Sequence, residues 1–231
     1  MVAAGGLSAV RMEKLHPRSA LGAGVLLREH PRSAVAPVDD DQAIRSSLKW
    51  LIESVGLRVE AYTSADEFIR SYYPGRAGCL LLDVRMPGMS GLELQSQLES
   101  HDIRLPVIIL TGHGDVGMAV KAMKAGALDF IEKPFDDELL LAAIEKALTE
   151  DAEKREERAS QAEILARMSQ LTKRESQVME MVTNGKSNKE IAAELNVSAK
   201  TVEAHRAHVM EKMEAGSLAE LVRMAMIVSA A

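Results

Sequence analysis

An alternation of short apolar segments with amphipathic helical patterns, between residues 34 and 150, constrains this chain most. The apolar segments are 35–38, 56–62, 78–82, 106–110 and 129–131, and the helical patterns that follow them are 42–54, 64–71, 91–100, 116–125 and 137–148. Residues 80–82 and 107–110 are apolar at every position, as strands covered by helices on both faces are. Five βα units of this size predict a doubly wound α/β domain around a five-stranded parallel sheet.

The C-terminal residues 171–231 show only helical patterns, at about 172–183, 188–195, 199–213 and 217–228. Asn196-Val197-Ser198 joins the second and third of these, which makes the pair a candidate helix-turn-helix. With 231 residues, two domains are expected. We place the α/β domain at 34–148, a charged helical linker at 149–170, and a four-helix domain at 171–231.

Residues 1–33 differ from the rest, because they are rich in Ala, Gly, Ser and Arg and contain HPRSA at both 16–20 and 30–34. A signal peptide is one reading, since an apolar stretch at 20–27 follows basic residues. That stretch is short and holds two glycines, and charged residues separate it from the small residues at 34–36. We therefore expect a flexible or atypical N-terminal extension on a cytoplasmic protein.

The charge is distributed unevenly along the chain, whose net charge is −6. Residues 34–150 carry 11 basic and 19 acidic side chains, whereas 171–231 carry 8 of each. This balance excludes a protein that coats nucleic acid by bulk charge, but it permits a small DNA-reading head. The single cysteine, Cys79, excludes a disulfide framework. The chain contains no run of 18 apolar residues, so no membrane-spanning helix is predicted.

Polar side chains follow four of the predicted strands. Asp39 and Asp40 follow the first, Asp83 the third, Thr111 the fourth and Lys133 the fifth. The carboxyl ends of parallel strands share one sheet edge, where ligands of such folds bind. Three carboxylates there favour a hard cation such as Mg²⁺, and an aspartate can act as a nucleophile toward phosphorus. Singly, each aspartate reads as a turn residue, but jointly the five groups predict an aspartate that accepts phosphate, with Thr111 and Lys133 binding the phosphoryl oxygens.

The third C-terminal helix has an inward apolar stripe of Val202, Val209 and Met213, with His205 beside it. Its other face offers Lys200, Glu203, Ala204, Arg206 and Ala207. Arginine can read guanine, glutamate can accept a hydrogen bond from cytosine, and alanine can contact a thymine methyl group in the major groove.

Phosphate contacts are expected from Lys189, Lys200, Thr201 and helix N-terminal amides. A helix-turn-helix is also a common packing motif, so the pattern by itself leaves DNA binding and simple packing open. Residues 136–231 contain no aromatic side chain, which disfavours single-stranded nucleic acid. Because residues 171–231 carry no net charge, we expect weak DNA binding by a monomer and a need for dimerisation, which doubles the phosphate contacts.

Four segments resemble the receiver domain of bacterial two-component response regulators: VDDD at 38–41, LDVRMPGMSG at 82–91, TGHGD at 111–115 and FIEKPF at 130–135. Residues 171–228 resemble a LuxR-type helix-turn-helix. Together they are similar to the FixJ/NarL family, on its FixJ side. The resemblance implies sheet order 2-1-3-4-5, a sensor histidine kinase, double-stranded promoter DNA, a homodimer formed on phosphorylation, and a possible contact with RNA polymerase.

The resemblance also implies site roles. Asp83 would be phosphorylated, and Mg²⁺ would be held by Asp39, Asp40, Asp83 and the backbone carbonyl of Arg85. Phe130 would be a switch that follows Thr111, although by itself it reads as a core aromatic. Asn188 joins the predicted DNA contacts.

One residue departs from the family pattern, because Pro37 falls inside the first strand. Proline lacks a backbone donor and is rare in central strands. We therefore expect either a short, distorted strand or a non-native sequence before Val38.

Three functions follow from these features. The first is a transcription regulator activated by phosphorylation of Asp83, which is not an enzyme beyond assisting its own phosphotransfer and dephosphorylation. The second is an aspartate-nucleophile phosphatase of the haloacid dehalogenase type, but such enzymes carry a second Asp where this chain has Arg85. The third is a DNA-binding regulator that uses its receiver only as a phosphorylation-independent dimerisation module.

Overall fold

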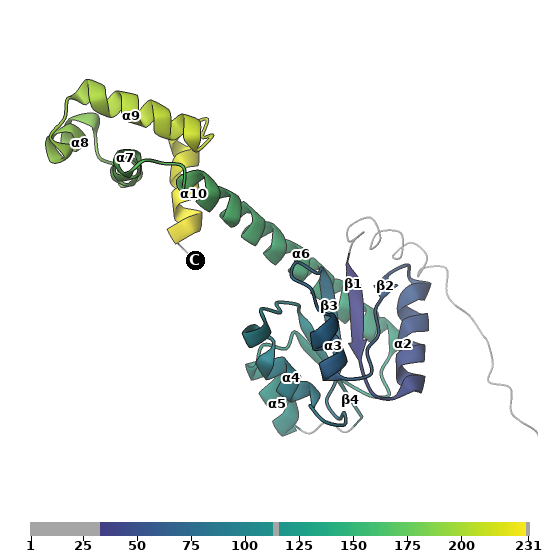
Figure 1. Cartoon of the computed structure of the whole chain (residues 1–231). Helices are drawn as coiled ribbons and strands as arrows, with labels where there is room; N and C mark the ends of the chain where they lie inside the picture. The colour runs from purple at the N-terminus through teal and green to yellow at the C-terminus, as the bar shows by residue number, and fades with distance from the viewer. Residues whose placement is uncertain (1–32, 113–115, 230–231) are drawn as a thin grey trace, which may run out of the picture. The chain divides into compact units, whose positions relative to one another are not determined.

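The computed structural model describes residues 33–112 and 116–229 (Figure 1). The chain divides into two compact units, Met1–Glu153 and Lys154–Ala231. The expected N-terminal extension, apart from Ser33, lies outside the described residues, and so do residues 113–115 of the TGHGD segment. Each unit has its own apolar core.

Five parallel strands form the sheet of the first unit. They are β1 (Ala34–Val38), β2 (Arg58–Val59), β3 (Gly78–Asp83), β4 (Val107–Thr111) and β5 (Asp129–Glu132). Their order is β2-β1-β3-β4-β5. The predicted doubly wound fold and strand order are therefore confirmed.

Helices cover both faces of this sheet (Figure 1). They are α2 (Gln42–Ser54) and α6 (Asp137–Met168) on one face, and α3 (Ala65–Ser71), α4 (Gly91–Gln97) and α5 (Val116–Lys124) on the other. Successive residues of a strand point to opposite faces. In β3, accordingly, Leu81 packs with α2 and α6, and Leu80 and Leu82 pack with α3 and α4.

Pro37 is accommodated without shortening β1. All five residues of β1 pair with β3, and Pro37 is buried. Its carbonyl accepts a hydrogen bond from the Tyr62 amide at 2.8 Å, so this residue faces β2. The amide and the carbonyl of a residue in a parallel strand face the same neighbour, and the missing donor therefore falls on the β2 side. The alternative of a short, distorted first strand is therefore wrong, and the alternative of a non-native sequence before Val38 stays a prediction.

Two predicted elements are shorter than expected. Of the expected strand at 56–62, only β2 is regular, and Tyr62 adds an isolated bridge to Val38. Because Pro37 has no backbone N–H to donate, the hydrogen bonding to β1 is interrupted between β2 and Tyr62. The helix expected at 91–100 ends at Gln97, and a 3₁₀ turn, η1 (Glu99–His101), follows it before Asp102 takes a left-handed conformation with φ 52°.

Helix α6 continues past the sheet through the predicted linker region. Asp151, which is 2% exposed, accepts a hydrogen bond from the Gly78 amide at 2.9 Å. This bond ties α6 to the start of β3.

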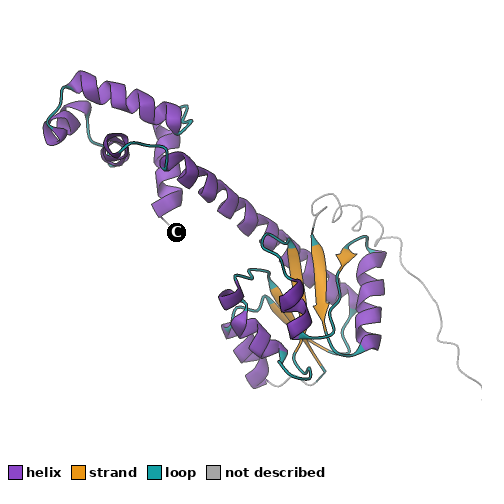
Figure 2. Ribbon diagram, viewed as in Figure 1, coloured by secondary structure: helices purple, strands orange, loops and turns teal. Residues whose placement is uncertain are grey.

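Helices are the only regular secondary structure among the described residues of the second unit, and short loops connect them (Figure 2). After the end of α6 come α7 (Lys173–Thr183), α8 (Asn188–Leu195), α9 (Ala199–Lys212) and α10 (Leu218–Ser229). Thr172, Ser187 and Ser198 are the N-caps of α7, α8 and α9, and each side chain accepts a backbone N–H three residues later. The four predicted helices are confirmed to within about a residue.

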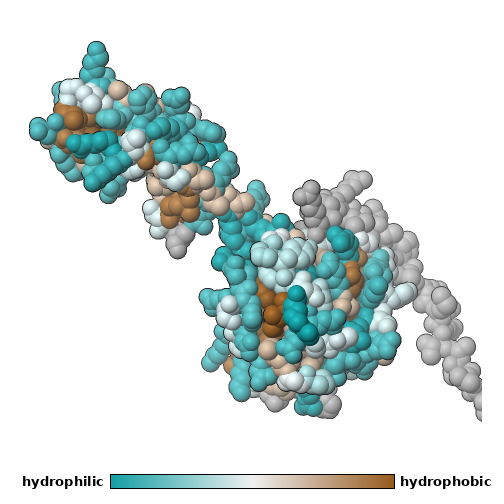
Figure 3. All heavy atoms as spheres, in the orientation of Figure 1, coloured by the Kyte–Doolittle hydropathy of each residue, from teal (hydrophilic) through white to brown (hydrophobic). Residues whose placement is uncertain are grey.

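The surface is mostly hydrophilic on the visible face of each unit, with apolar atoms in small separate patches (Figure 3). In the part of the chain that the structure describes, no helix combines the length and the hydropathy needed to cross a bilayer.

Candidate functional site

Three of the predicted polar residues meet at the carboxyl edge of the sheet. The Lys133 Nζ, just after β5, donates to Asp39 Oδ2 and to Asp83 Oδ1, each at 2.6 Å. Asp39 follows β1 and Asp83 ends β3, and these two strands are neighbours. The parallel sheet thus brings residues from distant parts of the sequence to one ammonium group.

The backbone holds the other oxygen of each carboxylate. Asp39 Oδ1 accepts from the Asp41 amide at 2.9 Å, and Asp83 Oδ2 accepts from the Arg85 amide at 2.7 Å. Asp39 is 3% exposed and Asp83 7% exposed. Buried carboxylates of this kind are stable only when paired and hydrogen-bonded, and both conditions hold here.

Burial raises the pKa of Asp83 above its usual range, although the Lys133 ammonium and the Arg85 amide oppose this shift. Burial also lowers the pKa of Lys133, but its hydrogen bonds to Asp39 and Asp83 outweigh that effect, and the net shift is upward. Lys133 is therefore firmly cationic, and one positive charge faces two acidic groups.

The remaining predicted residues surround this cluster differently. Thr111, at the end of β4, is fully buried, and its carbonyl accepts from the Lys133 amide at 2.7 Å. Phe130 is half-buried and packs in the apolar cluster on the α3–α5 face. The Asp40 side chain is exposed and has no described contact with Lys133. Arg85 is exposed, and only its amide is seen at the site.

The donor set at this edge fits Mg²⁺. Carboxylate oxygens are the ligands that this hard cation prefers, and it keeps several water molecules. Asp39, Asp40 and Asp83, with the Arg85 carbonyl, are the groups of this chain that would hold it. Bound there, Mg²⁺ would neutralise negative charge on a phosphoryl group.

Gly91 is a positioning residue to which the sequence pattern assigns no role of its own. A Cβ added there would lie 2.1 Å from the Asp83 backbone oxygen. Only glycine lets α4 begin this close to the candidate phosphoacceptor, with the Gly91 amide donating to the Val84 carbonyl at 3.1 Å. The signal was a glycine directly after Ser90, the N-cap of α4.

The faces of α9 divide as its sequence predicts. Val202, Val209 and Met213 are buried in the core of the second unit. Five of the predicted DNA contacts on α8 and α9 are exposed: Lys189, Lys200, Glu203, Ala204 and Ala207.

Three candidate DNA contacts, Arg206, Asn188 and Thr201, are held by hydrogen bonds within the second unit. The Arg206 Nη1 donates to Asn188 Oδ1 at 2.7 Å, which joins α9 to the start of α8. The Thr201 amide donates to the Ser198 hydroxyl at 3.1 Å, as part of the α9 cap. Arg206 is thereby oriented along the α8–α9 pair before any ligand binds.

Two family models match this chain, one for each unit. The response regulator receiver domain matches residues 35–145, and the luxR family of bacterial regulatory proteins matches residues 169–225. FixJ of Azorhizobium caulinodans, a transcriptional regulatory protein, is 49% identical over 84% of this chain and 92% of its own length. The chain belongs to the FixJ/NarL family of two-component response regulators.

Other response regulators are similar over comparable lengths. The response regulator protein TodT of Pseudomonas putida is 44% identical over 83% of this chain and 84% of its own. The solved structure of the response regulator StyR has a TM-score of 0.77 with 44% identity, covering 84% of this chain and 98% of that one. Full-length FixJ from B. japonicum has a TM-score of 0.53, covering 87% and 98%. This family is one of transcription regulators and not of classical enzymes.

Proposed function

We propose that this response regulator is activated when a sensor histidine kinase phosphorylates Asp83, and that phosphorylation promotes dimerisation and binding to double-stranded promoter DNA. The observation that carries the proposal is the Lys133 ammonium at 2.6 Å from both Asp39 and Asp83. Because it reads promoter DNA, this regulator acts in the cytoplasm, and RNA polymerase at the promoter is its further partner.

The transfer itself is a displacement at phosphorus. An Asp83 carboxylate oxygen forms a bond to phosphorus while the P–N bond of a kinase phosphohistidine breaks, and the imidazole nitrogen keeps the electron pair. Lys133 then pairs with a phosphoryl oxygen, and the Thr111 hydroxyl binds another. Mg²⁺ supplies charge neutralisation when bound. The receiver assists this transfer and the later hydrolysis of its own phosphoaspartate, and acts on no other substrate.

The response is proposed to pass through Thr111 and Phe130 to the surface formed by α5 and by residues 131–148. Exposed apolar side chains support a dimer contact there: Val116 is 82% exposed, Val120 46%, Met123 48% and Leu139 55%. A dimer covers this apolar area and pairs two DNA-reading units on a two-fold site, which doubles the phosphate contacts.

The decisive experiment uses Asp83→Asn in the full chain. With acetyl phosphate and Mg²⁺, we expect the parent protein to be labelled, to dimerise and to bind its promoter more tightly. Asp83→Asn should lose all three responses, and Asp66→Asn, an exposed aspartate on α3, should keep them. If Asp83→Asn keeps donor-dependent dimerisation and binding, the phosphorylation mechanism is wrong. If neither protein is labelled and both bind DNA as dimers, the receiver is a phosphorylation-independent dimerisation module.

A further inference from the structure

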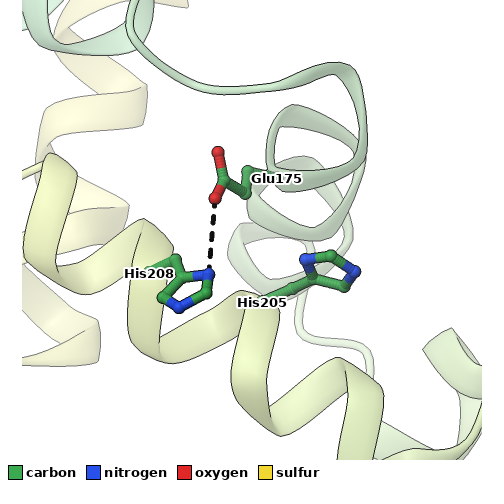
Figure 4. Close-up of side chains that lie close together, drawn as sticks. All are labelled: Glu175, His205 and His208. Atoms are coloured by element: carbon green, nitrogen blue, oxygen red, sulfur yellow. Dashed lines mark ion pairs between the residues drawn. The ribbon is translucent and has the colours of Figure 1, made fainter.

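Three metal-ligating side chains lie together in the second unit, away from the candidate phosphoacceptor. Glu175 of α7 and His205 and His208 of α9 each offer one ligand atom, and these atoms all lie within 4.8 Å of one another. Figure 4 shows the carboxylate projecting from α7 toward α9, where the two imidazole rings flank it. The two histidines are three residues apart, a spacing that places side chains on one side of a helix.

The carboxylate is held in place by groups that leave one oxygen facing the rings. Glu175 Oε2 accepts from the Thr172 amide at 2.8 Å and from the Lys212 Nζ at 2.7 Å. Glu175 Oε1 faces His208 Nδ1 at 3.6 Å, which is longer than a hydrogen bond. The hydrogen bond from Lys212, with those from Thr172, lowers the pKa of Glu175 to about 2, so the group is a carboxylate at neutral pH.

We propose that Glu175, His205 and His208 form a Zn²⁺ site that joins α7 to the predicted DNA-reading helix α9. Zinc binds imidazole nitrogen and carboxylate oxygen, and a site with three protein ligands keeps its fourth position for water. Two imidazoles favour Zn²⁺, Ni²⁺ or Cu²⁺ over Mg²⁺. The ligand atoms close to about 3.3 Å around a tetrahedral ion, which the exposed His208 reaches by side-chain rotation.

Lys212 sets the expected strength of the site. Its ammonium stays on Glu175 Oε2 and repels a divalent ion, and His208 is 59% exposed. We therefore expect a dissociation constant in the micromolar range at neutral pH. A simple ion-pair network, the competing explanation, has no need of His205 and gains nothing from added zinc.

The first experiment is a calorimetric titration of the full chain with ZnCl₂ in excess MgCl₂, which fills the acidic edge of the sheet. We expect one zinc equivalent to bind, and His205→Gln and His208→Gln each to weaken this binding at least tenfold. His101→Gln, which alters a histidine in the first unit, should bind zinc as the parent does. Zinc should also raise the unfolding midpoint of the second unit by about 5 °C at saturation, and this shift should disappear in both α9 variants.

Lys212→Met separates a metal site from an ion-pair network. Removing the ammonium should tighten zinc binding several-fold if zinc sits on Glu175 Oε1. The proposal is overturned if the double variant His205→Gln/His208→Gln binds zinc as tightly as the parent, or if His101→Gln weakens binding equally. If Lys212→Met fails to fold, the histidine variants, which leave the Glu175–Lys212 pair intact, still decide the question.

Discussion

The two units pair their buried carboxylates with lysine in different ways. In the first unit, Asp39 and Asp83 are buried at a sheet edge and share one ammonium. In the second unit, Glu175 is as buried as these two carboxylates, but it pairs with Lys212, whose side chain is 33% exposed against 14% for Lys133. A buried cluster couples its members, so that adding one charged phosphoryl group must rearrange all of them. A single carboxylate paired with a partly exposed ammonium has no second carboxylate to couple to, so its loss affects the stability of its own unit.

Removing Lys133 is the strongest way to test this contrast. Lys133→Met leaves two buried carboxylates without a counter-charge and removes the group that would bind the phosphoryl oxygen. We expect labelling of Asp83 by acetyl phosphate to fall by roughly 10²–10³-fold. Lys146→Met, which alters an exposed lysine on α6, should label as the parent does. Equal labelling of the two variants would contradict the role given to Lys133.

Gly91→Ala tests how tightly the sheet edge is packed. The added methyl group would meet the Asp83 carbonyl at 2.1 Å, and the start of α4 has to move. We expect the first unit to lose about 2–3 kcal/mol of unfolding free energy, measured by urea denaturation. Gly112→Ala is the matched control, because no atom lies within 4 Å of a Cβ at that position.

Arg206→Ala tests whether single side chains of the second unit contribute independently to the free energy of DNA binding. Losing one guanidinium that reads a base costs about 1–3 kcal/mol of DNA-binding free energy. Lys189→Ala should instead weaken binding similarly for all sequences and reduce the salt dependence by about one unit of slope. Fluorescence anisotropy at several salt concentrations distinguishes the two. Equal effects on matched and mismatched DNA would remove Arg206 from the base contacts.

Glu175→Gln should have a smaller effect, of about 1–2 kcal/mol on the stability of the second unit, through a weakened bond to Lys212. The folded-state pKa of Glu175, about 2, lies below its ordinary 4.5. The stabilisation is therefore present above about pH 4.5 and is lost as the pH falls toward 2. Urea midpoints at pH 7 and pH 3 should show a smaller acid-induced loss in the variant than in the parent.

Pro37→Ala should be nearly neutral, changing stability by less than about 1 kcal/mol. Alanine restores an amide donor on the β2 side, but it loses the proline's restriction of the unfolded chain. The pairing of β1 with β3 does not use this position's amide. A loss of several kcal/mol in urea denaturation would show that the proline is needed for the strand itself.

The sheet and the helices follow from sequence because periodicity reports burial directly. Leu80 and Leu81 are apolar since both faces of β3 are covered, and Asn188–Leu195 is a helix with the predicted ends. Strand ends also placed Asp39, Asp83 and Lys133 at one edge, because parallel strands share their direction.

Other features could not be predicted because they depend on side-chain reach and on pairing across the sheet. No periodicity indicates that Asp40 is exposed while Asp39 faces Lys133, or that β2 is only two residues long. The approach of Gly91 to Asp83 and the bond between Arg206 and Asn188 are likewise set by how helices dock. The prediction that Pro37 shortens the first strand was wrong, because the sequence alone does not show that the Pro37 nitrogen faces β2. That orientation depends on the order of the strands in the sheet.

Pro37 also divides the sheet into parts that should open at different rates. Strands β1, β3, β4 and β5 share uninterrupted pairing, whereas β2 is held by two paired residues and the bridge at Tyr62. Opening β2 breaks few hydrogen bonds and exposes little of the core, so its amides should exchange with solvent long before those of β3. The candidate phosphoacceptor stands at the end of the slow-exchanging β3, and the acidic edge therefore rests on the most persistent part of the receiver.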